Sequence, residues 1–324
     1  NTPLLPQNER LLQPVDCIFL MAASPLHFPS MDSDYLRGKP LIFMWKDLSN
    51  ILSNTFSQYI QLYFREQYGK IRTRLRFYFQ IDPTREKLNN ANTIRKDVQG
   101  GRILYHYIGF GFPKIDESSI YTIDHKSGSF VHYPVKFLFE NLKPPAWLIF
   151  DCSNAGSILK TLEKTATEKI NSISEKNNAS NYVRPIDWKD WFCICATDAN
   201  EDLPIDPHIP RDFLTSCLLS PVKMAVICHI IQYYRTTIVN DYFPLDQMNS
   251  PLLSEDSPLY SALQRTLSAI TDSIAVDSLS PDVFRLLFRK DRLTMVLFQR
   301  FLLAQYLLKP FQVHPKSNPS IPDL

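Results

Sequence analysis

The sequence predicts an α/β fold: a doubly wound sheet flanked by helices, with a helical extension at the C-terminal end. Two observations predict it. Up to about Arg211, short and nearly continuous apolar runs alternate with segments of helical spacing, which is typical of strands and helices that wind a mostly parallel sheet. After Arg211, helical periodicity continues with few strand signals, so a helical region follows the sheet.

Strands are expected where apolar residues run together without alternation. Residues 15–23, Val-Asp-Cys-Ile-Phe-Leu-Met-Ala-Ala, fit a strand that is buried on both faces, as in a parallel sheet. Residues 71–77 differ, because Ile, Thr, Leu and Phe alternate with Arg and predict a half-buried strand. The remaining strand candidates are residues 41–45, 102–108, 146–150 and 191–196.

Helices are expected where apolar residues recur every three or four positions. Residues 47–68 show this spacing, and Asp82-Pro83 predicts an N-cap followed by Pro at the first position of the next helix. A polar loop is expected at residues 173–190. The other predicted helices are residues 155–172, 212–235, 258–276 and 281–308.

Three parts are expected along the chain. Residues 12–210 form the α/β domain, residues 211–309 form the helical part of the same module, and residues 310–324 form a Pro-rich tail or linker. Because the first residue is Asn1 rather than Met, we expect the chain to be a piece of a longer protein.

Composition excludes several classes of protein. The chain has 35 Lys and Arg against 33 Asp and Glu, a net charge of +2, which argues against a general nucleic-acid binder. Its six Cys lie mostly in apolar runs and form no Cys-x-x-Cys pair, so we expect buried, reduced thiols and no metal site. No apolar run reaches the ~20 residues that span a bilayer. No cofactor or cofactor-binding residue is predicted.

Two of the predicted strands end in small-residue turns that form the candidate site. Residues 104–111 read Leu-Tyr-His-Tyr-Ile-Gly-Phe-Gly, and residues 151–156 read Asp-Cys-Ser-Asn-Ala-Gly. In open α/β sheets, ligands and catalytic groups gather at the carboxyl ends of strands.

The order and spacing of these turns resemble the catalytic loops of the caspase and metacaspase clan. There the first strand ends in Gly-His-Gly, whose His is the general base, and the second in Asp-x-Cys-x-x-Gly, whose Cys is the nucleophile. Here the His position is Phe110, between Gly109 and Gly111, and the Cys position is Ser153. Phe carries no exchangeable proton and a lone Ser is a poor nucleophile, so we expect these vestigial positions to be non-catalytic.

Two residues nearby leave alternatives open. Cys152 is expected to face the core, because neighbouring residues on a strand point to opposite faces. His106 lies four residues before Phe110, roughly 13 Å away along a strand, and is expected to be a core histidine. A cysteine peptidase with an atypical dyad, Cys152 with His106 or His132, is one alternative. A small-ligand sensor that uses the vestigial pocket is the other.

The resemblance is closest to the raptor family. Residues 151–156 match the loop of its N-terminal conserved domain letter for letter, and residues 104–111 resemble its Leu-Phe-His-Tyr-Asn-Gly-His-Gly. Phe110 replaces the usual His, so the chain resembles a divergent member. Further segments resemble the family in the same order: residues 210–218, 269–275, 282–304 and 310–322.

The resemblance implies a caspase-like fold and a non-catalytic scaffold that recruits substrates to a TOR-family kinase complex in growth and nutrient signalling. The implied partners are the kinase and its propeller subunit, substrate proteins that bear a short hydrophobic-acidic motif, and small GTPases, with no nucleic acid. The implied location is cytoplasmic, with recruitment to the lysosome or vacuole surface through partners.

Two charged features could belong to a site or to the structure alone. A groove for the implied motif needs an apolar pocket and a nearby cation, which Arg72, Arg74 and Arg76 could supply. We expect instead that these arginines form a solvated strand face. Asp272 lies in an apolar helical segment, so we expect it to pair with a buried donor. Residues Phe288, Leu293, Val296, Leu297, Phe301 and Leu302 are expected in the core.

Overall fold

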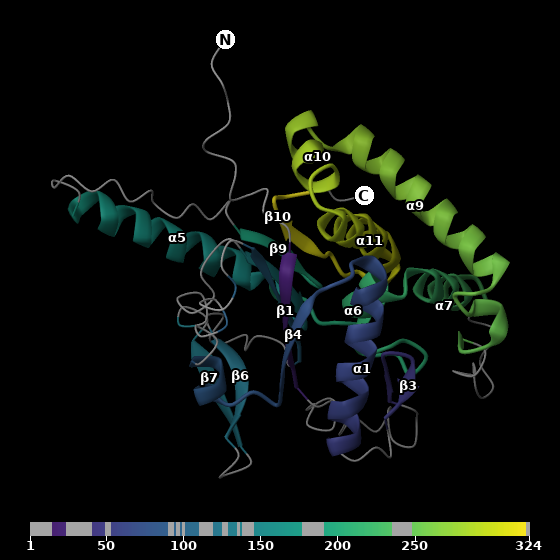
Figure 1. Ribbon diagram of the computed structural model, residues 1–324, viewed down its shortest axis with the longest axis horizontal. Coiled ribbons are helices and arrows are strands. Elements are labelled where there is room, and N and C mark those ends of the chain that lie inside the picture. The colour runs from purple at the N-terminus through teal and green to yellow at the C-terminus, as the bar shows by residue number, and fades with distance from the viewer. Residues whose placement is uncertain are drawn as a thin grey trace. The chain divides into compact units, whose positions relative to one another are not determined.

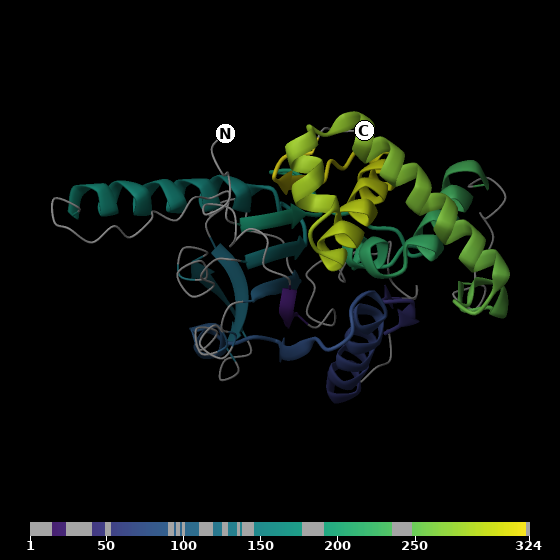
Figure 2. The ribbon, with the colours of Figure 1, turned by 45° about the horizontal axis from the view of Figure 1, so that its top comes forward.

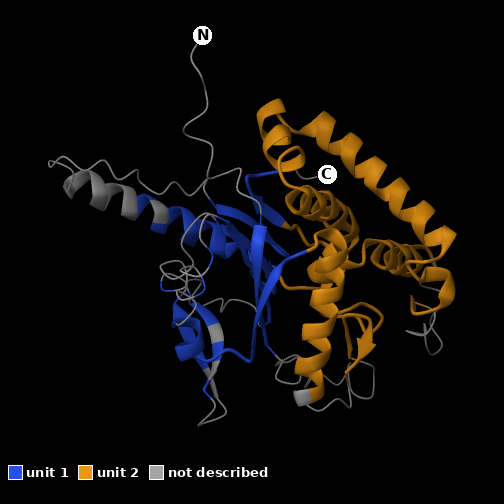
Figure 3. Cartoon of the chain, viewed as in Figure 1, with its two compact units in different colours: residues 1–23, 74–201, 316–321 blue, residues 24–73, 202–315, 322–324 orange. Residues whose placement is uncertain are grey.

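The computed structural model describes most of the chain in two compact units, which Figure 3 shows in different colours. Unit 1 comprises residues 1–23, 74–201 and 316–321, and unit 2 comprises residues 24–73, 202–315 and 322–324. Within these ranges, the structure describes residues 15–23, 41–48, 53–89, 94, 98, 101–109, 119–124, 129–134, 137, 146–176, 191–234 and 248–321.

A sheet of six strands forms the centre of unit 1 (Figure 1). Its strands are β1 (Val15–Ala22), β4 (Arg76–Ile81), β5 (Arg102–Ile108), β8 (Ala146–Asp151), β9 (Trp191–Cys195) and β10 (Lys316–Asn318). Across the sheet their order is β4-β1-β5-β8-β9-β10, and only β10 is antiparallel to its neighbour. The chain adds β4 on one side of β1 and the later strands on the other, which is the order of a doubly wound sheet.

The main core of unit 1 lies against one face of this sheet. Alternate residues of β1, β5, β8 and β9 contribute to it, and Phe19 of β1 packs edge-to-face on Tyr105 of β5 with 5.7 Å between ring centroids. The residues between them, such as Ile18 and Leu104, are also buried. Burial on both faces explains why these strands are nearly continuous apolar runs. The core also includes residues from α2 (Arg85–Asn89), α5 (Ser157–Lys176) and the hairpin of β6 (Ser119–Asp124) and β7 (Ser129–Pro134).

Unit 2 is built around one buried helix, α11 (Arg292–Leu308) (Figures 1 and 2). It contacts α1 (Ser53–Ile71), α6 (Phe213–Leu219), α7 (Pro221–Tyr234), α9 (Pro258–Ser278) and α10 (Pro281–Phe288). The shorter elements of unit 2 are the hairpin of β2 (Ile42–Phe43) and β3 (Lys46–Asp47) and the 3-10 helices η6 (Pro251–Leu253) and η7 (Lys309–Phe311).

The predicted α/β fold class is confirmed, and so are the strands at β1, β5, β8 and β9. The helical segments after Arg211 are also found, but two of them are interrupted. Residues 212–235 divide at Ser220, because Pro221 cannot continue α6 and instead begins α7. Residues 281–308 divide before Asp291, whose side chain caps α11 by accepting a hydrogen bond from the Thr294 N–H.

The arginine strand predicted at residues 71–77 is wrong. Helix α1 continues to Ile71, Arg74 has a left-handed φ of 63°, and β4 begins only at Arg76. Arg72 forms an ion pair with Asp291, with 2.8 Å between Nη1 and Oδ1. The three arginines therefore share no strand face, and the alternation that suggested one crosses a helix end and a turn.

Other element boundaries also differ from the prediction. Residues 41–45 contribute only a short strand of a hairpin, and α1 begins at Ser53 rather than at residue 47. Residues 173–176 continue α5, while residues 177–190 of the expected loop lie outside the described part of the chain.

Helix α2 is capped by Thr84, not by Asp82 as predicted. The Lys87 N–H donates to Thr84 Oγ1 at 3.3 Å, one turn into the helix. Asp82 has a left-handed φ of 47°, and its N–H donates to the Ala22 carbonyl at 2.8 Å. That bond continues the pairing of β1 with β4 past the end of the strand, so Asp82 belongs to the sheet edge.

Two features near the C-terminal end concern earlier predictions. Lys316–Asn318 was expected in an extended tail but forms β10, which pairs with β9. Asp272 finds the partner predicted for it, because the buried Gln299 donates its Nε2 hydrogen to Asp272 Oδ1. Of the residues predicted to be core, all are buried except Val296, which is half-buried.

Candidate functional site

The two turns named by the sequence begin side by side at the carboxyl edge of the sheet. Strands β5 and β8 are neighbours, and the Gly109 N–H donates to the Asp151 carbonyl at 3.3 Å. The sequence therefore identified two strand ends that lie side by side in the sheet. Phe110 and Gly111, which complete the first turn, lie outside the described residues.

The second turn, residues 151–156, is closed by the segment that follows β9. The Ala155 N–H donates to Thr197 Oγ1 at 2.9 Å, and that hydroxyl donates to the Cys152 carbonyl at 3.4 Å. Ala155, Thr197 and Cys152 are all buried, so these bonds replace contacts that the same groups would make with water.

Asn154 joins the same two segments by a second pair of bonds. It has a left-handed φ of 56°, a conformation that Asn tolerates better than most residues. Its N–H donates to the Glu201 carbonyl at 2.7 Å, and its Oδ1 accepts from the Asn200 N–H at 2.6 Å. The turn is thus held by a buried amide side chain.

Gly156 is required in this turn because of a close backbone approach. A Cβ at this position would lie 2.8 Å from the Ala199 nitrogen and from the Asp198 Cα. A steric requirement therefore explains why Gly stands at this position.

Cys152 and His106 point to opposite faces of the sheet. Tyr107 pairs with Phe150 in the β5–β8 register, and Cys152 lies two residues after Phe150, so all three belong to the same buried core. His106 pairs with Ile149 and therefore points to the other face.

The pKa shifts of Cys152 and His106 also argue against a catalytic dyad. Burial raises the pKa of the Cys152 thiol well above its usual value, and the charge of Asp151 raises it further. Burial lowers the pKa of His106 to about 3. A thiolate beside an imidazolium needs the reverse of both shifts. The predicted core placement of both residues is confirmed by their complete burial.

His132, the other candidate base, is no better placed. It lies on β7 next to Tyr133, which packs in the same core as Cys152. Because adjacent strand residues alternate between faces, His132 points away from that core, and its side chain is exposed. Ser153, the vestigial nucleophile position, lies half-buried in the turn after β8.

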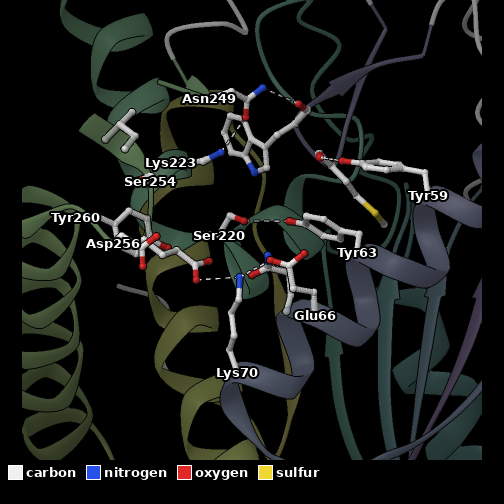
Figure 4. Close-up of a pocket in the computed structure, with 15 residues that line it drawn as sticks. Tyr59, Tyr63, Glu66, Lys70, Ser220, Lys223, Asn249, Ser254, Asp256 and Tyr260 are labelled. Atoms are coloured by element: carbon white, nitrogen blue, oxygen red, sulfur yellow. Dashed lines mark hydrogen bonds and ion pairs between the residues drawn. The ribbon is translucent and has the colours of Figure 1, made fainter. Parts of the chain in front are cut away.

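A pocket of about 460 Å³ lies within unit 2 (Figure 4). Four parts of the chain, far apart in sequence, contribute to it: the β2–β3 hairpin, α1, the start of α7, and the segment that runs from Asn249 through η6 into α9. Its lining residues are Met44, Trp45, Tyr59, Tyr63, Glu66, Gln67, Lys70, Ser220, Lys223, Asn249, Leu253, Ser254, Glu255, Asp256 and Tyr260.

One cation of the pocket is neutralised by the protein itself. Lys70 Nζ lies 2.7 Å from Glu66 Oε1 and 2.8 Å from Glu255 Oε2, as the dashed lines in Figure 4 show. Burial alone lowers the pKa of Lys70, but its hydrogen bonds to Glu255 and Glu66 outweigh that effect and raise the pKa overall.

The second cation, Lys223, has a different environment. Its ammonium donates to Asn249 Oδ1 at 2.9 Å and lies 5.6 Å from the ring centroid of Trp45. Asn249 in turn donates to the Trp45 carbonyl at 3.1 Å. Burial lowers the pKa of Lys223, and the nearby charge of Glu255 offsets only part of that effect.

Trp45 is held in an unfavourable backbone conformation. Met44 and Trp45 are the two residues of the β2–β3 turn, and both have left-handed φ angles, 48° and 63°. Such turns favour Asn-Gly, and other residues pay about 1–2 kcal/mol each. The buried Asp212 accepts from the Met44 N–H at 2.8 Å, and the Tyr59 hydroxyl donates to the Met44 carbonyl, so the turn is fixed from both sides.

The sequence did not reveal this pocket. Trp45 and Met44 were placed in a predicted strand, and Lys223 in a helix, with no motif linking them to Asn249 or Tyr260. The local feature that marks this site is the pair of positive φ angles at Met44 and Trp45, and these angles can be seen only in the structure.

Two further features bear on the type of site. Within the described ranges, no three His, Cys, Asp or Glu side chains are arranged to hold a metal ion. No helix of the described segments is long and apolar enough to cross a membrane.

Comparisons with known proteins find one family that the chain resembles. Residues 13–162 match the model of the Raptor N-terminal CASPase like domain. The chain is 31% identical over 261 residues to Regulatory-associated protein of TOR 2 of Oryza sativa subsp. japonica. That alignment covers 79% of this chain and 18% of the relative. It is 27% identical over 280 residues to Target of rapamycin complex 1 subunit KOG1 of Saccharomyces cerevisiae, with the same two coverages.

A solved structure shows the same fold. The crystal structure of Chaetomium thermophilum Raptor superposes on 96% of this chain with a TM-score of 0.77 and 24% identity, and the match covers 27% of that chain. The chain spans about a fifth of the length of the curated relatives it matches. The predicted resemblance to the raptor family is confirmed, since residues 13–162 match its N-terminal caspase-like domain and the curated relatives extend the similarity over 79% of the chain.

Proposed function

We propose that the chain is a non-catalytic scaffold segment of a raptor-like subunit that recruits substrates to a TOR-family kinase complex. The observation that carries this proposal is the similarity to subunits named for TOR complexes, because it extends over 79% of the chain and therefore well beyond residues 13–162. The fold shared with Raptor of Chaetomium thermophilum supports it.

The absence of peptidase chemistry is part of the proposal. The sequence puts Phe110 and Ser153 at the His and Cys positions of the caspase clan. Cys152 and His106 point to opposite faces of the sheet, and His132 points away from Cys152. These placements count against the atypical dyads.

The proposed partners follow from the family. They are the TOR-family kinase and its propeller subunit, substrate proteins with a short hydrophobic-acidic motif, and small GTPases. We propose a cytoplasmic location, with recruitment to the lysosome or vacuole surface through partners.

The test is affinity purification of the full-length parent protein from its own cells, followed by mass spectrometry. We expect a TOR-type kinase and its small propeller subunit in stoichiometric amounts. A preparation that retains other partners but lacks this kinase would contradict the scaffold role.

A second test addresses the catalytic positions alone. Phe110→His restores the residue usual in the clan, but Ser153 still lacks a thiol, so we expect no peptide cleavage by this variant. Measurable cleavage, absent from the wild-type chain, would show that the nucleophile had been assigned to the wrong residue.

A further inference from the structure

The pocket of unit 2 contains a buried donor that has no acceptor. Trp45 is 5% exposed, and its Nε1–H makes no hydrogen bond with any described residue. Most buried indole N–H groups donate to a partner, because a buried N–H loses its hydrogen bond to water and, if unpaired, gains none in exchange. Trp45 also lines the pocket, so its side chain adjoins the space that a ligand would fill.

A cation that lacks a carboxylate lies beside this donor. Lys223 Nζ is 5.6 Å from the centroid of the Trp45 ring, and its one hydrogen bond goes to the neutral Oδ1 of Asn249. No carboxylate of the described chain lies within ion-pair distance of it. Lys70, in the same pocket, has two such carboxylates, Glu66 and Glu255.

We propose that this pocket binds the carboxylate of a ligand through Trp45 Nε1 and Lys223 Nζ. Lys223 Nζ lies 5.6 Å from the centroid of the Trp45 ring, and neither donor is paired with a carboxylate of the described residues, so one ligand carboxylate could supply an acceptor to both. A carboxylate accepts several hydrogen bonds at once, and bonds that involve a charged group are the stronger ones.

The remaining lining favours a single negative charge. Only one cation of the pocket lacks a carboxylate partner, while Glu66, Glu255 and Asp256 also line it. These carboxylates repel every anion, but they repel a phosphate dianion, which usually needs several cations or an Arg fork, more strongly than a singly charged carboxylate. The rings of Tyr59, Tyr63 and Tyr260 offer apolar surface for the rest of the ligand.

The backbone supports a binding role for Trp45. Two consecutive residues, Met44 and Trp45, hold left-handed conformations that neither side chain favours, and Asp212 and Tyr59 fix them there. Strain that the surroundings maintain in this way is concentrated at functional sites. The site does not depend on the proposed scaffold role, since it is defined by unit 2 alone.

The test follows the Trp45 indole N–H by proton–nitrogen NMR of the whole 324-residue chain. The Trp45→Phe variant assigns the resonance. The probes are two matched pairs: N-acetylphenylalanine with its amide, and acetyl-Leu-Asp-amide with acetyl-Leu-Asn-amide. We expect a saturable shift with at least one carboxylate and none with its neutral counterpart. Binding of the free acid alone indicates a small metabolite, and binding of the Asp peptide indicates an acidic protein segment.

Variants at Lys223 separate binding from folding. Lys223→Gln should weaken carboxylate binding by about tenfold or more, and Lys223→Arg, which keeps the charge, should retain most of it. Lys290→Gln is the matched control, because Lys290 is exposed and does not line the pocket. Equal shifts by the acid and amide of each pair, or no saturable shift with either acid, would overturn the proposal whether or not the parent protein purifies with a kinase.

Discussion

The turn after β8 and the pocket of unit 2 treat their polar groups in opposite ways. In the turn, Thr197 and Asn154 accept or donate four bonds that tie residues 151–156 to the segment after β9. In the pocket, Trp45 Nε1 has no acceptor and Lys223 has no carboxylate partner. The turn resembles a catalytic loop in sequence, yet the polar groups that lack partners lie in the pocket.

This difference shows that a recognisable sequence motif can mark a structural turn rather than a binding site. The Asp-Cys-Ser-Asn-Ala-Gly turn is recognisable because a tight, closed turn restricts which residues fit, and Gly156 is one example. A binding site has to keep at least one donor available for its ligand, and Trp45 Nε1 is such a donor even though Asn249 bonds the Trp45 carbonyl. The comparison therefore predicts that substitutions in the turn cost more stability than a substitution in the pocket.

The largest effect is expected for Gly156→Ala. The added Cβ would lie 2.8 Å from backbone atoms of the 198–199 segment, which must move, so we expect a loss of about 3 kcal/mol in the free energy of unfolding by urea. Gly69→Ala is the control, because nothing lies within 4 Å of its Cβ, and in helix α1 it should gain about 0.5–1 kcal/mol. A stable Gly156→Ala variant would show that the turn is not closed as described.

His106 should make stability depend on pH. Burial lowers its pKa to about 3 in the folded chain, while the unfolded chain titrates near 6.5. As pH falls below 6.5, only the unfolded state takes up the proton, so stability present above that pH is lost. Between pH 7.5 and pH 5, wild type should lose about 2 kcal/mol more than His106→Asn. If wild type and His106→Asn lose the same free energy of unfolding between the two pH values, His106 is not buried in its neutral form.

Thr197→Val removes the hydroxyl that joins the two segments of the turn. The buried Ala155 N–H then loses its acceptor, so we expect a loss of about 1–2 kcal/mol in the same unfolding assay. Thr161→Val is a matched control, since its hydroxyl makes only a long 3.5 Å bond to the Ser157 carbonyl within α5. If both substitutions cost the same, the bonds of Thr197 contribute little to the turn.

The smallest change in stability is expected for Lys223→Met. Its half-buried ammonium has no carboxylate partner, and the bond it loses is exposed, so we expect a change of less than about 0.5 kcal/mol. Urea unfolding without added ligand checks this. A loss as large as that of Thr197→Val would show that Lys223 serves the structure and would weaken the proposed carboxylate site.

The sequence predicted those elements whose burial leaves a local pattern. Strands β1, β5, β8 and β9 are covered on both faces and therefore read as unbroken apolar runs. Strand β10 could not be predicted in this way, because Lys316–Asn318 is short, polar and followed by Pro, and becomes a strand only by pairing with β9. The arginine alternation at residues 71–77 misled because α1 keeps its hydrogen bonds as far as Ile71.

The same distinction explains which part of the candidate site could be predicted. The turn at residues 151–156 could be predicted because its residues are contiguous. The pocket could not, because Trp45, Lys223 and Asn249 meet only after the helices of unit 2 have packed. The strain at Met44 and Trp45 is likewise imposed by Asp212 and Tyr59, which are distant in sequence.

The most direct test of the non-catalytic account is labelling of the folded chain with a peptidyl electrophile that captures active-site cysteines, read by intact mass. All six cysteines are buried, and Cys152 faces the core, away from His106 and His132. We predict no adduct on the folded chain and labelling only after unfolding in urea. A single adduct on Cys152 of the folded chain would contradict the account and restore the peptidase hypothesis.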